Sequence, residues 1–198
     1  PNIFKAIFMA GGPGSGKSYV ARRTTGGLGM KMVNSDDIYE KMLNDAGLDT
    51  TPEDIYSDQG QEIRGRAKGV TKRMQGNFLE GRLGLIIDGT GKDYDKIAKQ
   101  VQGLKALGYE CYMIFVNTSH DTAQEQNAKR KRTLPEKEVA DMWNAVQNNI
   151  GRIQRLFGGK NFIVVDNNMA GEDVFEKVWK RCMLLVRKKV TNRIAKAW

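Results

Sequence analysis

The sequence is poor in cysteine, histidine and proline, and these shortages exclude several classes of protein. Its 198 residues include two cysteines, one histidine and four prolines. Two cysteines cannot build the framework of a disulfide-rich secreted domain, and both Cys111 and Cys182 lie in apolar surroundings, so we expect buried free thiols. The single histidine, His120, falls at the expected start of a helix, and we assign it no catalytic role.

Long hydrophobic runs, internal repeats and linkers rich in proline or serine are also absent. The apolar run near the N-terminus, residues 3–10, is too short to span a bilayer, and we find no signal peptide. A length of 198 residues suits one domain with a substantial core. We therefore expect a single cytoplasmic domain over residues 1–198 that does not associate with a membrane.

The net charge of +9 is concentrated near the C-terminus. Eight basic residues and no acid lie between Lys177 and Lys196, within a predicted basic C-terminal helix and tail at about 172–198. Such a cluster is either a solvated helix face or a surface for a polyanion such as nucleic acid.

Apolar runs of strand length alternate with helical patterns along the chain. Most of these runs lack a two-residue alternation, which is typical of strands buried on both faces of a parallel sheet. The pattern predicts an α/β fold of three layers, with a five-stranded parallel sheet and helices on both faces. The expected strands are residues 3–10, 31–35, 83–88, 109–117 and 161–166.

Two later helices carry apolar stripes that place Trp143 and Trp179 in the predicted core. Thr133 and Glu136 have the spacing of a capping box, so we expect them to begin the first of these helices. The second is expected at about 172–189.

The segment between the second and third strands is longer than a simple crossover needs, and we expect a helical insert at about 37–81 on the substrate side. It contains Gly60, Gly65, Gly69 and Gly76, each of which costs about 1 kcal/mol relative to alanine in a helix. Gly65 and Gly69 share a helix face, which would permit close approach of another helix or bending.

The stretch GGPGSGKS matches the phosphate-binding pattern G-x-x-x-x-G-K-[ST] and lies between a predicted strand and a predicted helix. Glycines let backbone N–H groups surround a phosphate chain, and the helix N-terminus adds partial positive charge. Lys17 is expected to reach the terminal phosphates, and the Ser18 hydroxyl to bind Mg²⁺. The predicted nucleotide-binding residues are Gly11, Gly12, Pro13, Gly14, Ser15, Gly16, Lys17, Ser18 and Tyr19.

Two other nucleotide-related motifs are missing. The chain has no N-K-x-D guanine-reading motif, and its third strand ends in LIIDGTG rather than in the Asp-Glu pair of an ATPase motor. Asp88 at that tip suits Mg²⁺, but no glutamate follows to polarise an attacking water. The pattern favours transfer to a bound acceptor over hydrolysis, and we include the nearby Thr90 among the acceptor contacts.

The stretch NSDD follows the second strand and places two carboxylates where an acceptor hydroxyl would meet the terminal phosphate. We predict that Asp36 orients the hydroxyl and accepts its proton. Asp37 is better explained as a first-turn acid of the next helix. The alternative is that both acids only cap that helix.

Two groups of cations complete the predicted site. Arg130 and Arg132, in the cluster AKRKRTLP, are placed to stabilise the phosphate during transfer, unless they only pair with a helix C-terminus. Arg64 and Arg66 on the insert would bind an anionic acceptor, although a solvated helix face explains them equally well.

Together GGPGSGKS, NSDD, LIIDGT and NAKRKRTLP resemble the P-loop kinases grouped around zeta toxins and the kinase domain of bacteriophage polynucleotide kinase. The similarity covers about residues 3–160 in motif order and spacing. It implies dependence on ATP and Mg²⁺, with Asp36 activating the hydroxyl, Asp88 at the tip of the third strand and Arg130 as the lid arginine. The chain is also similar to small kinases of tailed phages, which would place it in the host cytoplasm.

One position departs from this resemblance. Polynucleotide kinases carry an arginine three residues after the catalytic aspartate, where this chain has Tyr39, and Arg64 or Arg66 would have to substitute. The leading hypothesis is an ATP-dependent kinase acting on a hydroxyl of a polynucleotide 5′ end or of a nucleotide. The alternatives are a zeta-toxin-like kinase of a nucleotide sugar and a non-catalytic, ATP-dependent accessory protein that binds nucleic acid.

Overall fold

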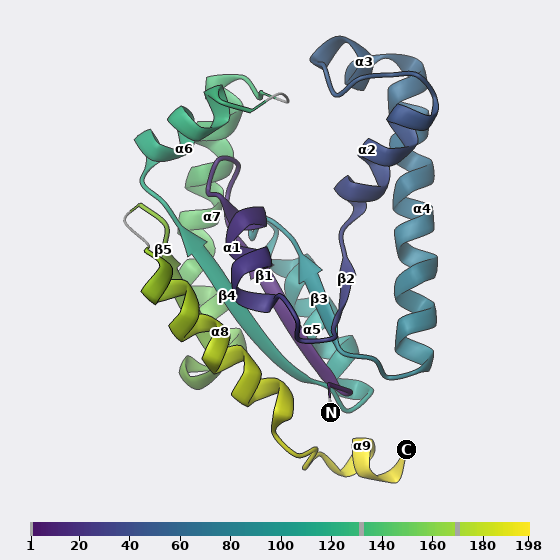
Figure 1. The fold of residues 1–198 in the computed structure, drawn as a ribbon, viewed down its shortest axis with the longest axis vertical. Helices are drawn as coiled ribbons and strands as arrows, with labels where there is room; N and C mark the ends of the chain where they lie inside the picture. Colours follow the sequence, from purple (N-terminus) through teal and green to yellow (C-terminus); the bar gives the residue numbers. More distant parts are fainter. Residues whose placement is uncertain (1, 131–132, 169–170) are drawn as a thin grey trace.

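A computed structural model describes residues 2–130, 133–168 and 171–198, and it contains a five-stranded parallel sheet between layers of helices (Figure 1). The strand order is β2-β3-β1-β4-β5, so the first strand lies in the middle. This is the predicted α/β architecture, with a five-stranded parallel sheet and helices on both faces. The strands are β1 (Lys5–Ala10), β2 (Lys31–Val33), β3 (Leu85–Asp88), β4 (Glu110–Asn117) and β5 (Phe162–Asp166).

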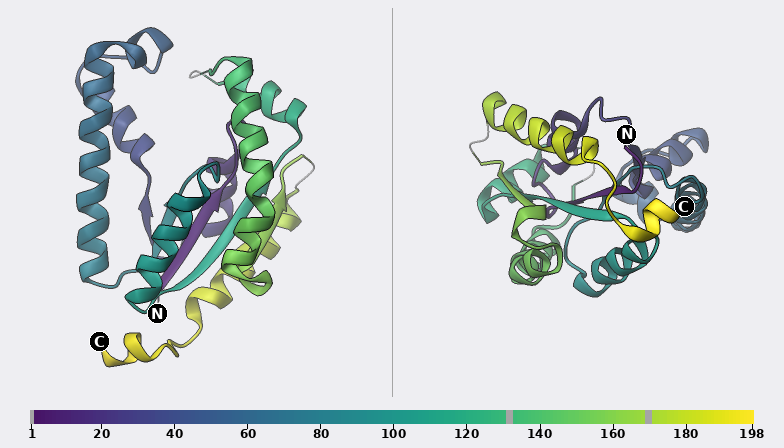
Figure 2. Two further views of the ribbon diagram at one scale, coloured as in Figure 1. Left: turned by 180° about the vertical axis from the view of Figure 1, so that it is seen from behind. Right: turned by 90° about the horizontal axis from the view of Figure 1, so that it is seen from below.

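Alternate side chains of β1 enter two different cores, which explains why the strands lack a two-residue pattern. Phe8 packs with residues of α5 (Tyr94–Ala106) and α7 (Glu136–Phe157) on one face of the sheet. Ile7 packs with residues of α1 (Lys17–Thr25) and α8 (Glu172–Arg187) on the other. Figure 2 shows these helices on opposite sides of the sheet. Cys111 and Cys182 are buried free thiols, as predicted.

A helical arm, which we define as residues 35–80, lies beside the edge strand β2. It consists of α2 (Ser35–Asp45), α3 (Pro52–Tyr56) and α4 (Asp58–Glu80). Five buried side chains form a small core inside the arm, separate from the two cores of the sheet. Figure 1 shows the arm extending beyond the carboxyl ends of the strands, with α3 at its tip. The arm core consists of Tyr39, Leu43, Ile55, Ile63 and Ala67.

Helix α4 is one continuous helix despite its glycines. Only Gly60 is needed sterically, because a Cβ atom there would lie 2.0 Å from the Asp54 carbonyl oxygen. A Cβ atom on Gly65, Gly69 or Gly76 would meet nothing within 4 Å. The prediction that Gly65 and Gly69 permit close helix approach is therefore wrong.

The predicted capping box is also wrong. Helix α7 begins at Glu136 with Pro135 as its N-cap, and no side chain in the described part of the chain caps it. The Asn127 amide, at the end of α6 (His120–Ala128), both donates to the Leu134 carbonyl at 2.8 Å and accepts from the Leu134 N–H at 3.0 Å. This pair of bonds fixes the approach to α7 in place of a local cap.

The two tryptophans predicted for the core are only half-buried. The Trp143 indole N–H donates to the Thr118 carbonyl at 3.0 Å, and that of Trp179 donates to the Gly26 carbonyl at 2.9 Å. Both rings therefore lie at the edges of helix contacts, where their N–H groups find carbonyl partners.

The C-terminal segment has two helices where the sequence predicted one helix and a tail. Helix α8 ends at Arg187, and after a break the short α9 (Arg193–Ala197) follows. The Trp198 ring packs edge-on against Phe4 with a centroid distance of 5.5 Å. Figure 1 shows α9 at the amino ends of the strands. Among the described residues, none of the helices combines the length and apolar character required of a membrane span.

A buried ion pair joins β1 to β4 at this same end of the sheet. Lys5, whose side chain is fully buried, pairs with Glu110, which also accepts a hydrogen bond from the Tyr112 hydroxyl at 2.8 Å. Burial raises the pKa of Glu110, but the hydrogen bonds and charge of Lys5 and the Tyr112 hydroxyl outweigh it, so the pKa lies below its usual range.

Glu110→Gln is expected to lower the free energy of unfolding at neutral pH by about 3 kcal/mol, because it leaves the Lys5 charge buried without its partner. The pKa of Glu110 is lower in the folded protein than in the unfolded chain. Its contribution to the free energy of unfolding is therefore complete above the unfolded-chain pKa and is lost as the pH falls through the folded-state pKa. Urea unfolding across this acidic range should therefore depend less on pH in the variant. The exposed Glu62→Gln serves as the control, and equal unfolding curves for wild type and Glu110→Gln would contradict the prediction.

Candidate active site

The glycine-rich loop between β1 and α1 has the shape that phosphate binding requires. Gly14 and Gly16 have φ angles of 73° and 76°, and a Cβ atom on Gly14 would lie 2.1 Å from the Ala123 carbonyl oxygen. Gly16 is the N-cap of α1, and none of the described side chains caps this helix. The first N–H groups of α1 are therefore available to an anion.

Ser15 has a buried hydroxyl in this loop, and its Oγ has no hydrogen-bond partner among the described residues. A buried hydroxyl without a partner is costly, so a ligand oxygen would satisfy it. The Ser15 carbonyl accepts a hydrogen bond at 2.8 Å from the side chain of Asn167, whose backbone N–H donates to the Asn117 carbonyl at 2.9 Å. Sequence reasoning missed Asn167, for which the only signal was a polar pair directly after the fifth strand.

Lys17 and the tips of two strands form a compact polar cluster. The Lys17 Nζ lies 2.5 Å from Asp88 Oδ1, and the Asn34 amide donates to Asp88 Oδ2 at 3.0 Å. The parallel register of β2 with β3 aligns Val33 with Ile87, which places the following residues, Asn34 and Asp88, side by side. The Asp88 carboxylate therefore links the residue that begins NSDD to Lys17.

Asp36 and Asp37 lie in the first turn of α2, at the same carboxyl edge. Asn34 is the N-cap of this helix, and its side-chain oxygen accepts from the Asp36 N–H at 2.9 Å. Both aspartates are exposed. Burial, followed by the charges of Asp88 and Asp36, raises the pKa of Asp37, while Arg22 and Lys17 oppose the shift. The pKa of Asp37 therefore depends on the charges of Lys17 and Asp88. The interpretation of Asp37 as an acid that only favours the helix dipole did not include this interaction.

The predicted cations lie apart from one another. The Arg64 guanidinium is 5.9 Å from the centroid of the Tyr39 ring. This contact connects α4, which carries Arg64, with α2, which carries Tyr39. Arg66 is exposed on α4, and Arg130 is exposed just beyond α6. Arg132 lies outside the described residues. Polynucleotide kinases carry an arginine at the position of Tyr39. In this chain the Arg64 side chain lies against the ring at that position.

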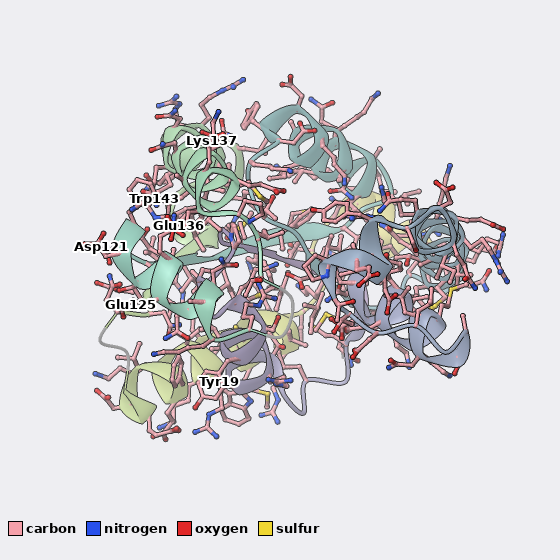
Figure 3. All side chains as sticks on the ribbon, turned by 90° about the horizontal axis from the view of Figure 1, so that it is seen from above. Tyr19, Asp121, Glu125, Glu136, Lys137 and Trp143 are labelled. Atoms are coloured by element: carbon pink, nitrogen blue, oxygen red, sulfur yellow. The ribbon has the colours of Figure 1, made fainter. Side chains whose placement is uncertain are left out.

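The remaining predicted contacts lie around the loop. The Thr90 carbonyl accepts from the Gly11 N–H at 2.9 Å and so fixes the segment after β3 to the phosphate loop. Ser18 is exposed on α1. The Tyr19 ring is 47% exposed and meets Phe175 of α8 at 5.6 Å, and Figure 3, which looks onto the carboxyl ends of the strands, shows it beside that helix.

These residues fit a nucleotide with Mg²⁺. The uncapped start of α1, the partnerless Ser15 Oγ and the Lys17 ammonium provide complementary groups for a polyphosphate. Within the described parts of the chain, no three His, Cys, Asp or Glu side chains form a metal-binding group. Mg²⁺ does not need such a group, because it keeps several waters and binds through one or two protein oxygens together with substrate phosphates. Asp88 and Ser18 are the candidates for those oxygens.

Several solved structures have a similar fold. A candidate kinase from Chloroflexus aurantiacus J-10-fl matches with a TM-score of 0.58 and 16% identity, covering 93% of this chain and 97% of its own. A protein of the PezAT chromosomal toxin–antitoxin system of Streptococcus pneumoniae gives 0.62 and 17%, covering 98% and 87%. A chain of the Pnkp1/Rnl/Hen1 RNA repair complex gives 0.58 and 18%, with 77% of this chain covered and 47% of that one.

At these identities the structural matches establish the fold alone. No curated protein matches the chain by sequence. A family model described as "AAA domain" matches residues 7–148, which is more than half of the chain and includes the phosphate loop, both aspartates and the arm. The chain therefore belongs to the AAA domain family and has the P-loop kinase fold.

Proposed function

We propose that this protein is an ATP·Mg²⁺-dependent kinase that transfers the γ-phosphate to a hydroxyl of a polynucleotide 5′ end or of a nucleotide. The observation that carries this proposal is the cluster at the carboxyl edge, where Lys17 and Asn34 both contact Asp88 and Asn34 also caps the helix whose first turn contains Asp36 and Asp37. A phosphate-binding lysine and an acceptor-side carboxylate are thereby held on adjoining segments.

The proposed reaction assigns one task to each group. The acceptor oxygen forms a bond to the γ-phosphorus, the bond from that phosphorus to the β,γ-bridging oxygen breaks, and ADP leaves. Asp36 orients the hydroxyl and takes its proton. Lys17 and the first N–H groups of α1 neutralise the phosphates, and Mg²⁺ bound near Asp88 and Ser18 would share that charge.

An acceptor phosphate would lie towards the helical arm. Arg64 is half-buried, and its guanidinium lies against the Tyr39 ring, one helical turn beyond Asp36. Arginine binds phosphate oxygens in a planar, two-pronged geometry. We therefore propose Arg64, with Arg66 more exposed on the same helix and Thr90 at the tip of β3, as acceptor contacts, and Arg130 and Arg132 as the lid cations.

Two alternative functions are distinguished from this proposal by the experiment described below. The motif resemblance to zeta toxins and the absence of arginine at position 39 favour a kinase of a nucleotide sugar as the second candidate. A non-catalytic accessory protein that binds ATP and nucleic acid would use the basic residues between Lys177 and Lys196 instead. Figure 1 places α9, which carries Arg193 and Lys196, at the end of the strands opposite the glycine-rich loop, whereas four of these basic residues lie on α8.

Incubation with γ-labelled ATP and a panel of acceptors would test the proposal. The panel contains 5′-hydroxyl oligonucleotides, nucleosides, nucleotides and sugar nucleotides, each with Mg²⁺ and with EDTA. We expect label to enter the oligonucleotides or nucleotides only when Mg²⁺ is present. Label only in sugar nucleotides would favour the second candidate, and ATP binding without transfer to any acceptor would contradict the kinase proposal.

A further inference from the structure

A pocket of about 190 Å³ lies between the edge strand β2, the start of α2 and the C-terminal half of α4. Apolar side chains form most of its wall, and they come from all three of these elements. Its position on the arm side of the sheet separates it from the phosphate loop, which lies between β1 and α1. The apolar side chains are Met32, Val33, Ile38, Met74 and Phe78.

The polar end of the pocket joins it to the candidate active site. Asn34 and Asp37 line the pocket, and the Asn34 amide donates to the same Asp88 carboxylate that pairs with Lys17. The Asp37 carboxyl also senses the charges of Lys17 and Asp88. A molecule in this pocket would therefore have one end beside the group that holds the terminal phosphate.

The pocket offers little to a charged or strongly polar occupant. No lysine or arginine among the described residues lines it. The Thr71 hydroxyl already donates to the Ala67 carbonyl at 2.8 Å, and the Asn34 amide already donates to Asp88. A phosphate in the pocket would lose its hydration without gaining a cation, so the buried part of the occupant is uncharged.

A cation is available just outside the pocket, on the same face of α4. Arg64 precedes Thr71 by seven residues, which is two helical turns or about 10 Å along the helix. Residues seven apart share a helix face, so Arg64, Thr71 and Phe78 follow one line along α4. The arrangement supplies an apolar pocket, a carboxylate at its end and a phosphate-binding side chain beyond it.

We infer that this pocket holds the base of the acceptor's terminal nucleoside, with the 5′-hydroxyl at the Asn34–Asp37 end and the following phosphate outside, towards Arg64. This inference rests on the proposed kinase function. A base offers two flat π-faces, which suit the Phe78 ring and the adaptable side chains of Met32 and Met74. A pocket of this size accepts one such ring system and excludes the phosphate that follows the nucleoside.

The test uses two 5′-hydroxyl oligonucleotides that differ only at the first residue, which carries a base in one and is abasic in the other. Transfer of γ-labelled phosphate is measured as kcat/KM for each. Because base stacking contributes about 1–3 kcal/mol, the abasic acceptor should be poorer by about 5- to 150-fold. Equal kcat/KM values for both oligonucleotides would overturn the inference and leave the kinase proposal intact.

A pocket-filling variant gives an independent reading. Met74 is 37% exposed at the edge of the pocket, so Met74→Trp can fill the pocket without disturbing a buried core. The variant should lower kcat/KM for the intact oligonucleotide towards the abasic value and should leave the affinity for ATP unchanged. Lys72→Trp, which adds the same ring to an exposed position of α4 away from the pocket, should keep the wild-type preference.

Three results distinguish a failure of the pocket inference from a failure of the proposed kinase function. Loss of the base preference in Met74→Trp but not in Lys72→Trp supports the pocket. A preference that survives in Met74→Trp shows that the base is recognised elsewhere and overturns the inference. No transfer to any hydroxyl acceptor by the wild-type protein contradicts the proposed function, and the inference fails with it.

Discussion

Asp36→Asn is expected to lower the rate of phosphate transfer by about 10²- to 10⁴-fold while ATP still binds with wild-type affinity. Asparagine keeps the size of the side chain and its place in the first turn of α2, but it cannot accept the hydroxyl proton. The backbone N–H of residue 36 can still donate to the Asn34 side chain, so the cap of the helix is preserved. The measurement is single-turnover transfer from labelled ATP to an acceptor that the wild-type protein is shown to use.

Two companion variants make this result specific. Asp45→Asn removes the same charge from an exposed position at the other end of α2 and should transfer phosphate normally. Asp37→Asn changes the carboxylate at the pocket and should act mainly on the KM for the acceptor. If Asp36→Asn retains near-normal transfer, the role proposed for Asp36 is wrong.

Lys17→Met is expected to reduce transfer by about 10²- to 10³-fold and also to weaken ATP binding. Lys17 is the side chain in direct contact with Asp88, at 2.5 Å, and it follows the N-cap glycine of α1. Methionine has a similar length and no charge, so the variant removes the counter-charge for the phosphates without opening a gap. Transfer is measured at saturating ATP, and ATP affinity is measured separately by calorimetry.

The control for this change is Lys99→Met on the exposed face of α5, which alters the net charge equally. The ligand-free variant should keep its fold, which circular dichroism would check. Wild-type transfer rates in Lys17→Met would remove the basis for assigning the loop to catalysis. An effect on ATP affinity alone would restrict Lys17 to binding.

Local sequence patterns predicted the parts of the fold that are determined by residues close together in the sequence. Buried strands, the loop and the long helix α4 follow from apolar runs, glycine spacing and helix-forming residues in continuous segments. The edge strand was predicted two residues too long at its end, because Asn34 was expected to extend the strand and instead caps α2. The side chain of Asn34 serves the helix and the Asp88 carboxylate together, and only the pairing of β2 with β3 brings those two partners to it.

Contacts between distant segments explain the other errors. Thr133 and Glu136 have the right spacing for a cap, but the bonds from Asn127 to Leu134 set the backbone there instead. Likewise, nothing in the residues around Asn167 indicates that it binds the carbonyl of Ser15, because 152 positions of sequence separate them. The pocket beside β2 was missed for the same reason, since its wall combines residues from the strand and from the far half of α4.

The separate core of the helical arm has a consequence for how such a protein can diverge. Tyr39, Leu43, Ile55, Ile63 and Ala67 pack with one another rather than with either face of the sheet. Substitutions among them alter the geometry on the acceptor side and leave the packing beneath the phosphate loop as it is. If the proposed kinase function holds, selection can change the acceptor through the arm while the residues around the glycine-rich loop stay the same, so the arm can diverge independently of the rest of the domain.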